Sequence, residues 1–389
     1  MKTRLFKMNR SDLINQLSVG LVLMTLFAIQ LPEGGTLLLL PALLLVYFQR
    51  AVFHIEPELK RIGGLFIAYV VIFAVVSTDP SRSAKGAYDI VRGLLVFFPA
   101  VWLGVQLARV QERSFAVFIG LLFILANLAF PHVIGEQVFY GYHDNPNNVA
   151  VALTAHLFLL AALYPQRLAG PRFWHVLAFV AALCAALLLL VLANSRGSWL
   201  GVAVAFSLIT MLQPAIPRRI KLALILAAGA GLLALVTLAD MKGFGYGTVG
   251  ARIEIWTGLW KLTVTDHLWL GYGINYVKDV LMASGLPTLT AHNVFLELFV
   301  STGLIGLTAF LYIAYRLVAF LLRQNYTRGA VLYAGVGGLA AFLVMGLFDL
   351  KFASFKFIAM TSCFLGLIYS QRVQSGINRQ TRQMAPELG

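Results

Sequence analysis

Long apolar runs recur along the whole chain and constrain its fold more than any other feature. Most are close to the roughly 20 residues that cross a lipid bilayer as a helix. Twelve runs lie at 12–31, 34–49, 63–78, 86–108, 114–131, 146–165, 173–193, 197–213, 219–240, 293–322, 329–348 and 353–371. Charged residues make up only 12% of the 389 residues, whereas a soluble domain has about a quarter. The sequence therefore predicts an all-α integral membrane protein with about twelve transmembrane helices.

The spacing of the runs divides the chain into four parts. Most loops are short, but the segment between the ninth and tenth runs is long, and long loops are usually functional or carry their own structure. We expect helices one to nine in 1–240, a large loop in 241–292, helices ten to twelve in 293–371 and a polar tail in 372–389.

The basic residues predict the orientation of the chain. Twenty of the 30 lysines and arginines fall on the side that carries the N-terminus, and such an excess marks the cytoplasmic side. We therefore expect both termini in the cytoplasm and the long loop outside. The net charge of +14 is spread over short loops between apolar runs. This is a membrane-protein pattern, so we predict contacts with membrane lipids and no nucleic-acid partner.

Ten basic residues lie on the outer side, where topology does not need them. They are Arg82, Lys85, Arg92, Arg196, Lys242, Arg252, Lys261, Lys278, Lys351 and Lys356. A cluster of this kind suits a bound polyanion. The alternative is that each forms a salt bridge with one of the eleven acids on the same side.

The long loop contains an amphipathic pattern. In 249–264, Arg252, Trp256, Leu259 and Trp260 recur at helical spacing. We predict a helix at the membrane interface, with both tryptophans at headgroup level. A second short helix is predicted around 275–284.

His292 is the best candidate for a general base, because an imidazole titrates near neutral pH. It lies where the long loop meets the tenth span; the alternative is an interfacial histidine at a helix start. Asn293 is a plausible N-cap. Glu297 lies one turn further along, where a carboxylate needs a partner; orienting a neighbour and pairing with an arginine are both open.

Two further groups of cations are candidates for anion binding. Arg196 opens the eighth span, where a guanidinium and free backbone N–H groups coincide; the alternative is an arginine that extends to the interface from a hairpin turn. Lys85, Asp89 and Arg92 share one helix face. Lys85–Asp89 could be a structural pair, whereas an arginine at the depth of Arg92 marks a site.

Asn147 belongs to the aromatic and polar segment 140–148, which suits sugar binding; the alternative is an Asn/Pro turn with an aromatic belt. Asp349 lies in the last outer loop, where closing the basic cluster and pairing with a lysine are both open. The sequence has no D-x-D, no H-E-x-x-H and no Gly-rich loop followed by Lys-Ser/Thr. We therefore expect no metal and no cofactor, and arginines must neutralise any phosphorylated substrate.

Three short motifs, in this order and spacing, resemble the O-antigen ligase and polymerase superfamily of bacterial inner-membrane glycosyltransferases. They are Ser195-Arg196-Gly197; Arg252-x-x-x-Trp256 followed by Gly271-Tyr-Gly-Ile-Asn275; and His292-Asn293-x-x-Leu296-Glu297 followed by Gly303-Leu-Ile-Gly306. The upstream Asn145-Pro146-Asn147 is similar to a further family element.

The resemblance implies a twelve-span bundle of the GT-C type with a large periplasmic loop between spans nine and ten. It implies a glycan donor on undecaprenyl pyrophosphate and, for ligases, lipid A–core oligosaccharide as acceptor in lipopolysaccharide assembly. The family histidine corresponds to His292 and the two family arginines to Arg196 and Arg252. Independently of the resemblance, their positions and chemistry predict eight residues as substrate contacts: Arg82, Lys85, Arg92, Asn147, Trp256, Asn293, Glu297 and Asp349.

Other functions remain open at this point. An O-antigen polymerase or a protein O-oligosaccharyltransferase of the same superfamily would use the same chemistry on another acceptor. A transporter of an anionic lipid is a non-enzymatic alternative, but transporters place ionisable groups near the membrane midplane. The charges here lie near the span ends, which favours a reaction at the membrane surface.

Overall fold

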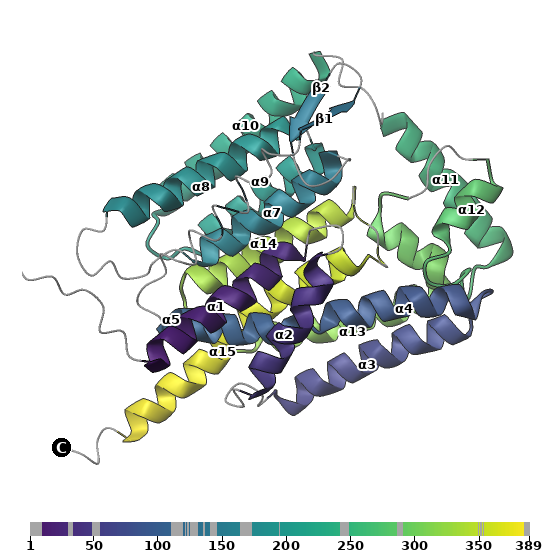
Figure 1. Ribbon diagram of the computed structural model, residues 1–389. Helices are drawn as coiled ribbons and strands as arrows, with labels where there is room; N and C mark the ends of the chain where they lie inside the picture. Colours follow the sequence, from purple (N-terminus) through teal and green to yellow (C-terminus); the bar gives the residue numbers. More distant parts are fainter. Residues whose placement is uncertain are drawn as a thin grey trace, which may run out of the picture.

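The computed structural model is a bundle of helices (Figure 1). It describes residues 10–29, 34–48, 55–109, 120, 122, 124, 131–134, 137–140, 146–163, 173–193, 195–241, 249–285, 291–348, 350, 352 and 354–384. From the N-terminus, the helices of the described residues begin with α1 (Arg10–Ala28), α2 (Gly34–Phe48), α3 (Pro57–Val75), α4 (Pro80–Leu94), α5 (Phe97–Arg109), α7 (Pro146–Ala162), α8 (Phe173–Leu192) and α9 (Arg196–Leu212). The others are α10 (Arg218–Met241), α11 (Val249–Asp266), α12 (Val277–Ala283), α13 (Val294–Leu322), α14 (Ala330–Gly346) and α15 (Phe355–Met384).

The helices follow the apolar runs. A helix covers each predicted span except 114–131, most of which lies outside the described residues. Within the described chain, Pro80–Leu107 and Val294–Leu322 are long and apolar enough to cross a bilayer, and six shorter apolar helices accompany them. Leucines on outer helix faces are exposed, such as Leu226 and Leu233 of α10. Such surfaces are typical of a membrane protein, because water solvates them poorly.

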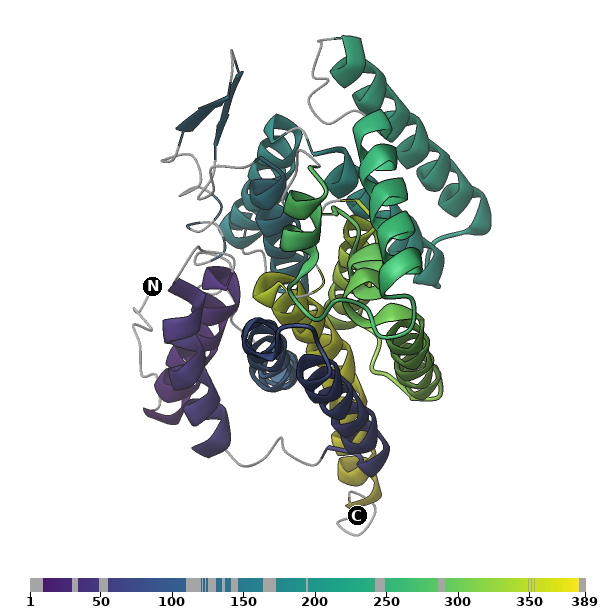
Figure 2. The same cartoon turned by 90° about the vertical axis from the view of Figure 1, so that its right-hand side faces the viewer.

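A small hairpin departs from the all-helical prediction. Strands β1 (Pro131–Ile134) and β2 (Gln137–Tyr140) pair antiparallel, with Pro131 opposite Tyr140 and Ile134 opposite Gln137. Figure 2 shows this hairpin at the edge of the molecule, and β2 contacts α7 and α8. Tyr140, expected in a polar loop, is therefore the last residue of a strand.

Helices α14 and α15 lie at the centre of the bundle. They pack on one another, α14 also contacts α7 and α9, and α15 contacts α4 and α5. Glycines allow the closest approaches: a Cβ on Gly335 or Gly338 of α14 would meet Ile368 or Phe364 of α15. The loop helices α11 and α12 gather at one end of the bundle, and the C-terminal end of α15 lies at the opposite end (Figure 1).

Helix α13 is broken at Gly303, whose left-handed φ of 63° and ψ of −167° are not helical. The segment 268–273 of the long loop docks at this break. Backbone N–H groups of Tyr272 and Gly273 donate to the carbonyls of Val300 and Ser301 at 2.8 and 2.9 Å. The N–H groups of Leu304 and Ile305 donate to the carbonyls of Leu268 and Trp269 at 2.8 and 3.2 Å. The loop thus satisfies backbone groups that the helix break frees.

Candidate active site

The turn that carries His292 has an unusual backbone. Of the described residues other than glycine, His292 and Asn275 have a positive φ, 52° and 66°. Side chains other than glycine adopt this left-handed region at a cost of about 1–3 kcal/mol, and surrounding contacts must hold them there. The side chain of His292 is half-buried.

Contacts on both sides of His292 hold the turn. Asn293 is the N-cap of α13, as predicted: its Oδ1 accepts hydrogen bonds of 3.0 Å from the N–H groups of Phe295 and Leu296. On the other side, the N–H of Ala291 donates to Glu297 Oε1 at 3.4 Å, and the carbonyl of Ala291 accepts from Trp256 Nε1 at 2.8 Å. The backbone before and after the imidazole is therefore fixed.

Glu297 joins this turn to the last outer loop. It is only 5% exposed, and its Oε2 accepts a 2.9 Å hydrogen bond from the N–H of Phe352. Both contacts fit the first role left open by the sequence, because the carboxylate orients neighbouring backbone; pairing with an arginine stays a prediction. Sequence reasoning missed Phe352, because its contribution is a backbone group and leaves no signal in the side chain.

Helix α11 places Arg252 beside the same turn. Arg252 is one helical turn before Trp256, so the two side chains lie on one face, and Trp256 holds the carbonyl next to His292. Ile255 and Leu259 of α11 pack with Val277 and Leu281 of α12 and with Val300 of α13. The predicted second helix is confirmed as α12. The indole N–H of Trp256 contacts protein, because α11 lies on α13; the position of both tryptophans at headgroup level stays a prediction.

Helix packing places Arg196 at the same end of the bundle. Arg196 is the first residue of α9, and its side chain is half-buried. A Cβ on Gly201 would contact Ala341 and Met345 near the end of α14, and a Cβ on Gly346 would meet Val294 at 3.4 Å. The start of α9 and the turn of His292 therefore both lie around the C-terminal end of α14.

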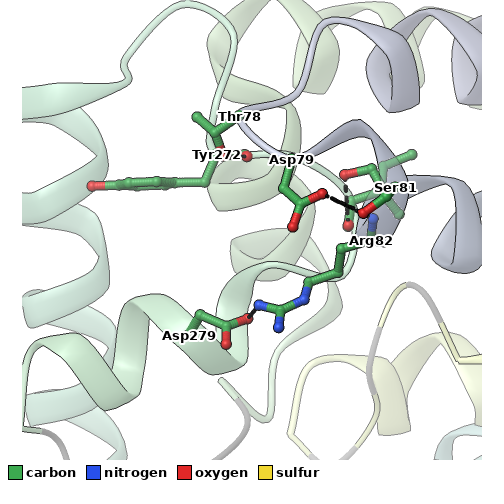
Figure 3. Close-up of polar contacts among 8 residues, drawn as sticks. Thr78, Asp79, Ser81, Arg82, Tyr272 and Asp279 are labelled. Atoms are coloured by element: carbon green, nitrogen blue, oxygen red, sulfur yellow. Dashed lines mark hydrogen bonds and ion pairs between the residues drawn. The ribbon is translucent and has the colours of Figure 1, made fainter.

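The two arginines of α4 have acidic and aromatic partners. Figure 3 shows the ion pair of Arg82 with Asp279. Arg82 forms an ion pair with Asp279 of α12 and lies over the ring of Tyr276 at 5.6 Å. Arg92 Nη2 lies 2.9 Å from Asp89 Oδ1, and its guanidinium lies 4.0 Å from the ring centre of Phe355. The salt bridges offered as the alternative interpretation are thus present for these two arginines. Asp89 pairs with Arg92 rather than with Lys85, whose side chain is exposed.

The N-terminus of α4 is tied to the docked loop. Thr78 Oγ1 donates to the carbonyl of Tyr272 at 2.6 Å, and Asp79 caps α4 by accepting from Ser81 Oγ at 2.7 Å and from the N–H of Arg82 at 3.1 Å (Figure 3). These hydrogen bonds, that of Ser81 first, hold the pKa of Asp79 below its ordinary value. Burial, followed by the charge of Asp266, raises the pKa of the Tyr272 phenol.

Two sequence candidates remain, Asn147 and Asp349. Asn147 is half-buried in the first turn of α7, a helix that packs against α14. Asp349 lies outside the described residues, although its neighbours Phe348 and Leu350 are described.

An open pocket of about 330 Å³ lies directly beside the His292 turn. It is lined by Trp256, Thr257 and Trp260 of α11 and by Asn293 and Leu296 at the start of α13. Trp256 and Asn293 were predicted from the sequence as substrate contacts. Trp260 and Thr257 were not predicted to line a pocket. For Trp260 the sequence did contain a signal, because it lies four residues after Trp256 and therefore on the same helix face.

Comparison with known families identifies the segment that contains this site. Residues 181–311 match the family model described as O-antigen ligase. This segment belongs to the O-antigen ligase family. It is about a third of the chain and includes Arg196, Arg252, the His292 turn and Glu297, so the resemblance drawn from the motifs is confirmed. No curated protein matches the chain.

Proposed function

We propose that the chain is an inverting, metal-independent glycosyltransferase. It moves O-antigen polysaccharide from undecaprenyl pyrophosphate to lipid A–core oligosaccharide. The main support is the hydrogen bond of 2.8 Å that Trp256 Nε1 donates to the carbonyl of Ala291, the residue before His292. Trp256 lies one helical turn after Arg252, and all of these residues belong to the segment that matches the O-antigen ligase family. A base and a cation are thereby held by one helix.

His292 acts as the general base. Its imidazole takes the proton from an acceptor hydroxyl as that oxygen attacks the anomeric carbon of the donor sugar. The new glycosidic bond forms while the bond from that carbon to the pyrophosphate oxygen breaks, and a single displacement inverts the carbon. The contacts of Trp256, Glu297 and Asn293 hold the strained turn in place before substrate arrives, and such prior ordering lowers the cost of reaching the transition state.

Arg196 and Arg252 stabilise the leaving group. Undecaprenyl pyrophosphate departs as an anion, so it needs positive charge rather than a proton. A guanidinium can bind two phosphate oxygens at once, and Arg196 lies at a helix start, where backbone N–H groups add to the attraction for anions. Lys85 and Arg92 extend the positive charge along α4, and the apolar surface between helices suits the lipid tails of both substrates.

This reaction belongs on the periplasmic face of the bacterial inner membrane. The loop helices and the start of α13 lie at one end of the bundle, opposite the C-terminal end of α15 (Figure 1). The excess of basic residues on the side of the termini supports a cytoplasmic location for both ends. A twelve-span arrangement of the GT-C type fits this placement.

Complementation of a deletion strain tests the proposal. The wild-type gene should restore lipopolysaccharide with attached O-antigen, whereas His292→Ala should leave lipid-linked polymer unattached, because loss of a general base costs about 10²–10⁴-fold in rate. A deletion strain that still attaches a single repeat would instead identify a polymerase. Wild-type transfer by a folded His292→Ala protein would rule out the base.

Arg→Lys variants test the pyrophosphate contacts. Lysine keeps the charge but loses the planar fork that binds two oxygens, so Arg196→Lys and Arg252→Lys should both transfer poorly. We expect weaker donor binding for Arg196→Lys and a larger loss in the transfer step for Arg252→Lys. Both variants should be measured by donor affinity and by single-turnover transfer. Normal behaviour of both would exclude two-oxygen binding.

A further inference from the structure

Trp260 presents a flat aromatic surface at the mouth of the pocket beside His292. Its indole stacks on the buried ring of Phe299, with ring centres 4.8 Å apart and planes inclined by 28°. The side chain is nevertheless 55% exposed. One face of the indole is thus held by protein, and binding a ligand on the exposed side costs little side-chain entropy.

Polar groups line the same pocket. Asn293 uses Oδ1 to cap α13, and its Nδ2 meets no hydrogen-bond partner among the described residues. Thr257 Oγ1 donates to the carbonyl of Ile253 at 2.8 Å, so its oxygen can still accept a hydrogen bond. An aromatic surface with amide and hydroxyl groups at its rim matches a sugar ring, which has apolar C–H faces and hydroxyls at its edge.

The order of residues along α11 assigns the pocket to one substrate. Arg252, Trp256 and Trp260 follow one another at intervals of four residues, about 6 Å of helix rise each. Trp256, in the middle, holds the turn of His292 through Ala291. Along α11, Arg252 therefore lies on one side of the residue that contacts this turn, and Trp260 lies on the other.

We propose that Trp256, Thr257, Trp260 and Asn293 form the subsite for the acceptor sugar. The inference rests on the proposed function, because it takes His292 as the base that acts on the acceptor hydroxyl. The 330 Å³ of the pocket lie at the low end of the range of about 300–1,000 Å³ for ligand sites. This size suits the terminal sugar unit of an oligosaccharide. A polyprenyl chain would leave the polar groups of Asn293 and Thr257 without partners.

Binding measurements on the purified full chain in lipid nanodiscs test the subsite. The two probes are lipid-free core oligosaccharide, which has sugars but no isoprenoid, and undecaprenyl phosphate, which has an isoprenoid but no sugar. Trp260→Ala should weaken oligosaccharide binding about tenfold or more and leave undecaprenyl phosphate binding unchanged. Trp260→Phe should retain part of the oligosaccharide affinity, because it keeps a ring on Phe299.

Trp269→Ala is the matched control. Trp269 lies in the same loop and is 61% exposed, but it does not line the pocket, so this variant should bind both probes normally. Three results for Trp260→Ala would overturn the subsite: loss of undecaprenyl phosphate binding alone, equal loss of binding to both probes, and no loss of binding to either. A wild-type protein without affinity for the oligosaccharide would overturn it as well. His292→Ala should bind both probes normally, so an error in the base assignment affects transfer and leaves these affinities intact.

Discussion

Glu297 accepts a 2.9 Å hydrogen bond from the backbone N–H of Phe352, fifty-five residues away in the chain. The other oxygen of the same carboxylate accepts from the N–H of Ala291 at 3.4 Å. One buried side chain therefore connects the turn of the candidate base to the last outer loop. A carboxylate suits this position because both of its oxygens are acceptors, and each faces a backbone donor.

Glu297→Gln should slow transfer without weakening donor binding. The substitution keeps the shape but turns one oxygen into a donor that faces another donor, so one buried N–H loses its partner. A displaced base can cost up to about 10²-fold in rate. We expect a lower single-turnover rate, an unchanged donor affinity and a folded protein.

Glu254→Gln is the control for this prediction, because Glu254 is an exposed carboxylate on α11. It should transfer glycan like the wild type. If the thermal stability of Glu297→Gln falls enough to account for the lost activity, the residue maintains the fold and does not position the base.

Gly303→Ala should destabilise the protein strongly. An added Cβ would overlap the backbone of Trp269 and Leu270, and the left-handed φ of 63° is itself unfavourable for alanine. Backbone strain and overpacking together should cost at least about 2 kcal/mol. Thermal unfolding in detergent should therefore show a clearly lower Tm.

Gly229→Ala provides the comparison, because Gly229 lies in α10 and an added Cβ meets nothing within 4 Å. Its Tm should equal or slightly exceed that of the wild type, since alanine favours a helix. Equal Tm values for Gly303→Ala and Gly229→Ala would show that the docked loop is not tightly packed at the break.

Local patterns predicted most of the helical fold and the composition of the site. The apolar runs anticipated the helices, the spacing of Arg252 and Trp256 anticipated α11, and Asn293 was recognised as an N-cap. Each of these features depends on residues a few positions apart. The hairpin also had a local signal, since two β-branched and aromatic stretches flank Gly135. It was not predicted, because the apolar run before it was interpreted as a span that reaches residue 131.

Contacts between distant segments were not predictable in the same way. The glycines at 271 and 303 were visible in the sequence, but only packing shows that Gly271 leaves room for the backbone at 301–303 and that Gly303 leaves room for the backbone of Trp269 and Leu270. The bond from Trp256 to the carbonyl of Ala291 and that from Glu297 to the N–H of Phe352 use backbone groups, which every residue has. Sequence patterns therefore identified His292 and Arg252 as candidates without showing what holds them together.

Acid should remove the contribution of Asp79 to stability. The native pKa of this cap is depressed, with the hydroxyl of Ser81 as the largest cause. A depressed carboxyl pKa stabilises the fold above the unfolded-state pKa, and this stabilisation is lost as pH falls through the native value. The Tm of Asp79→Ala should thus lie below that of the wild type at pH 7, and the gap should narrow below about pH 4.

Asp79→Asn keeps an oxygen for the cap but does not titrate. Its Tm difference from Asp79→Ala should stay constant over the same pH range, because neither variant titrates at this position, whereas the Tm of the wild type changes relative to both. A pH-independent gap for Asp79→Ala would show that the charge of the cap does not contribute.

Variants of the ion pair between Arg82 and Asp279 can distinguish the two interpretations of the outer basic residues, which are binding of a polyanion and formation of salt bridges. Its side chains are 43% and 33% exposed, so the pair should contribute little to stability. Because Asp279 offsets the charge of Arg82, we expect Arg82→Ala to reduce transfer only a few-fold, whereas Arg196→Ala should abolish it. The double variant Arg82→Asp with Asp279→Arg restores a pair of reversed polarity and should transfer better than Arg82→Asp alone.

The measurements are donor affinity and single-turnover transfer for all four proteins. If Arg82→Ala loses donor affinity as severely as Arg196→Ala, and reversal of the pair restores nothing, then Arg82 binds the anionic donor and the ion pair with Asp279 is secondary.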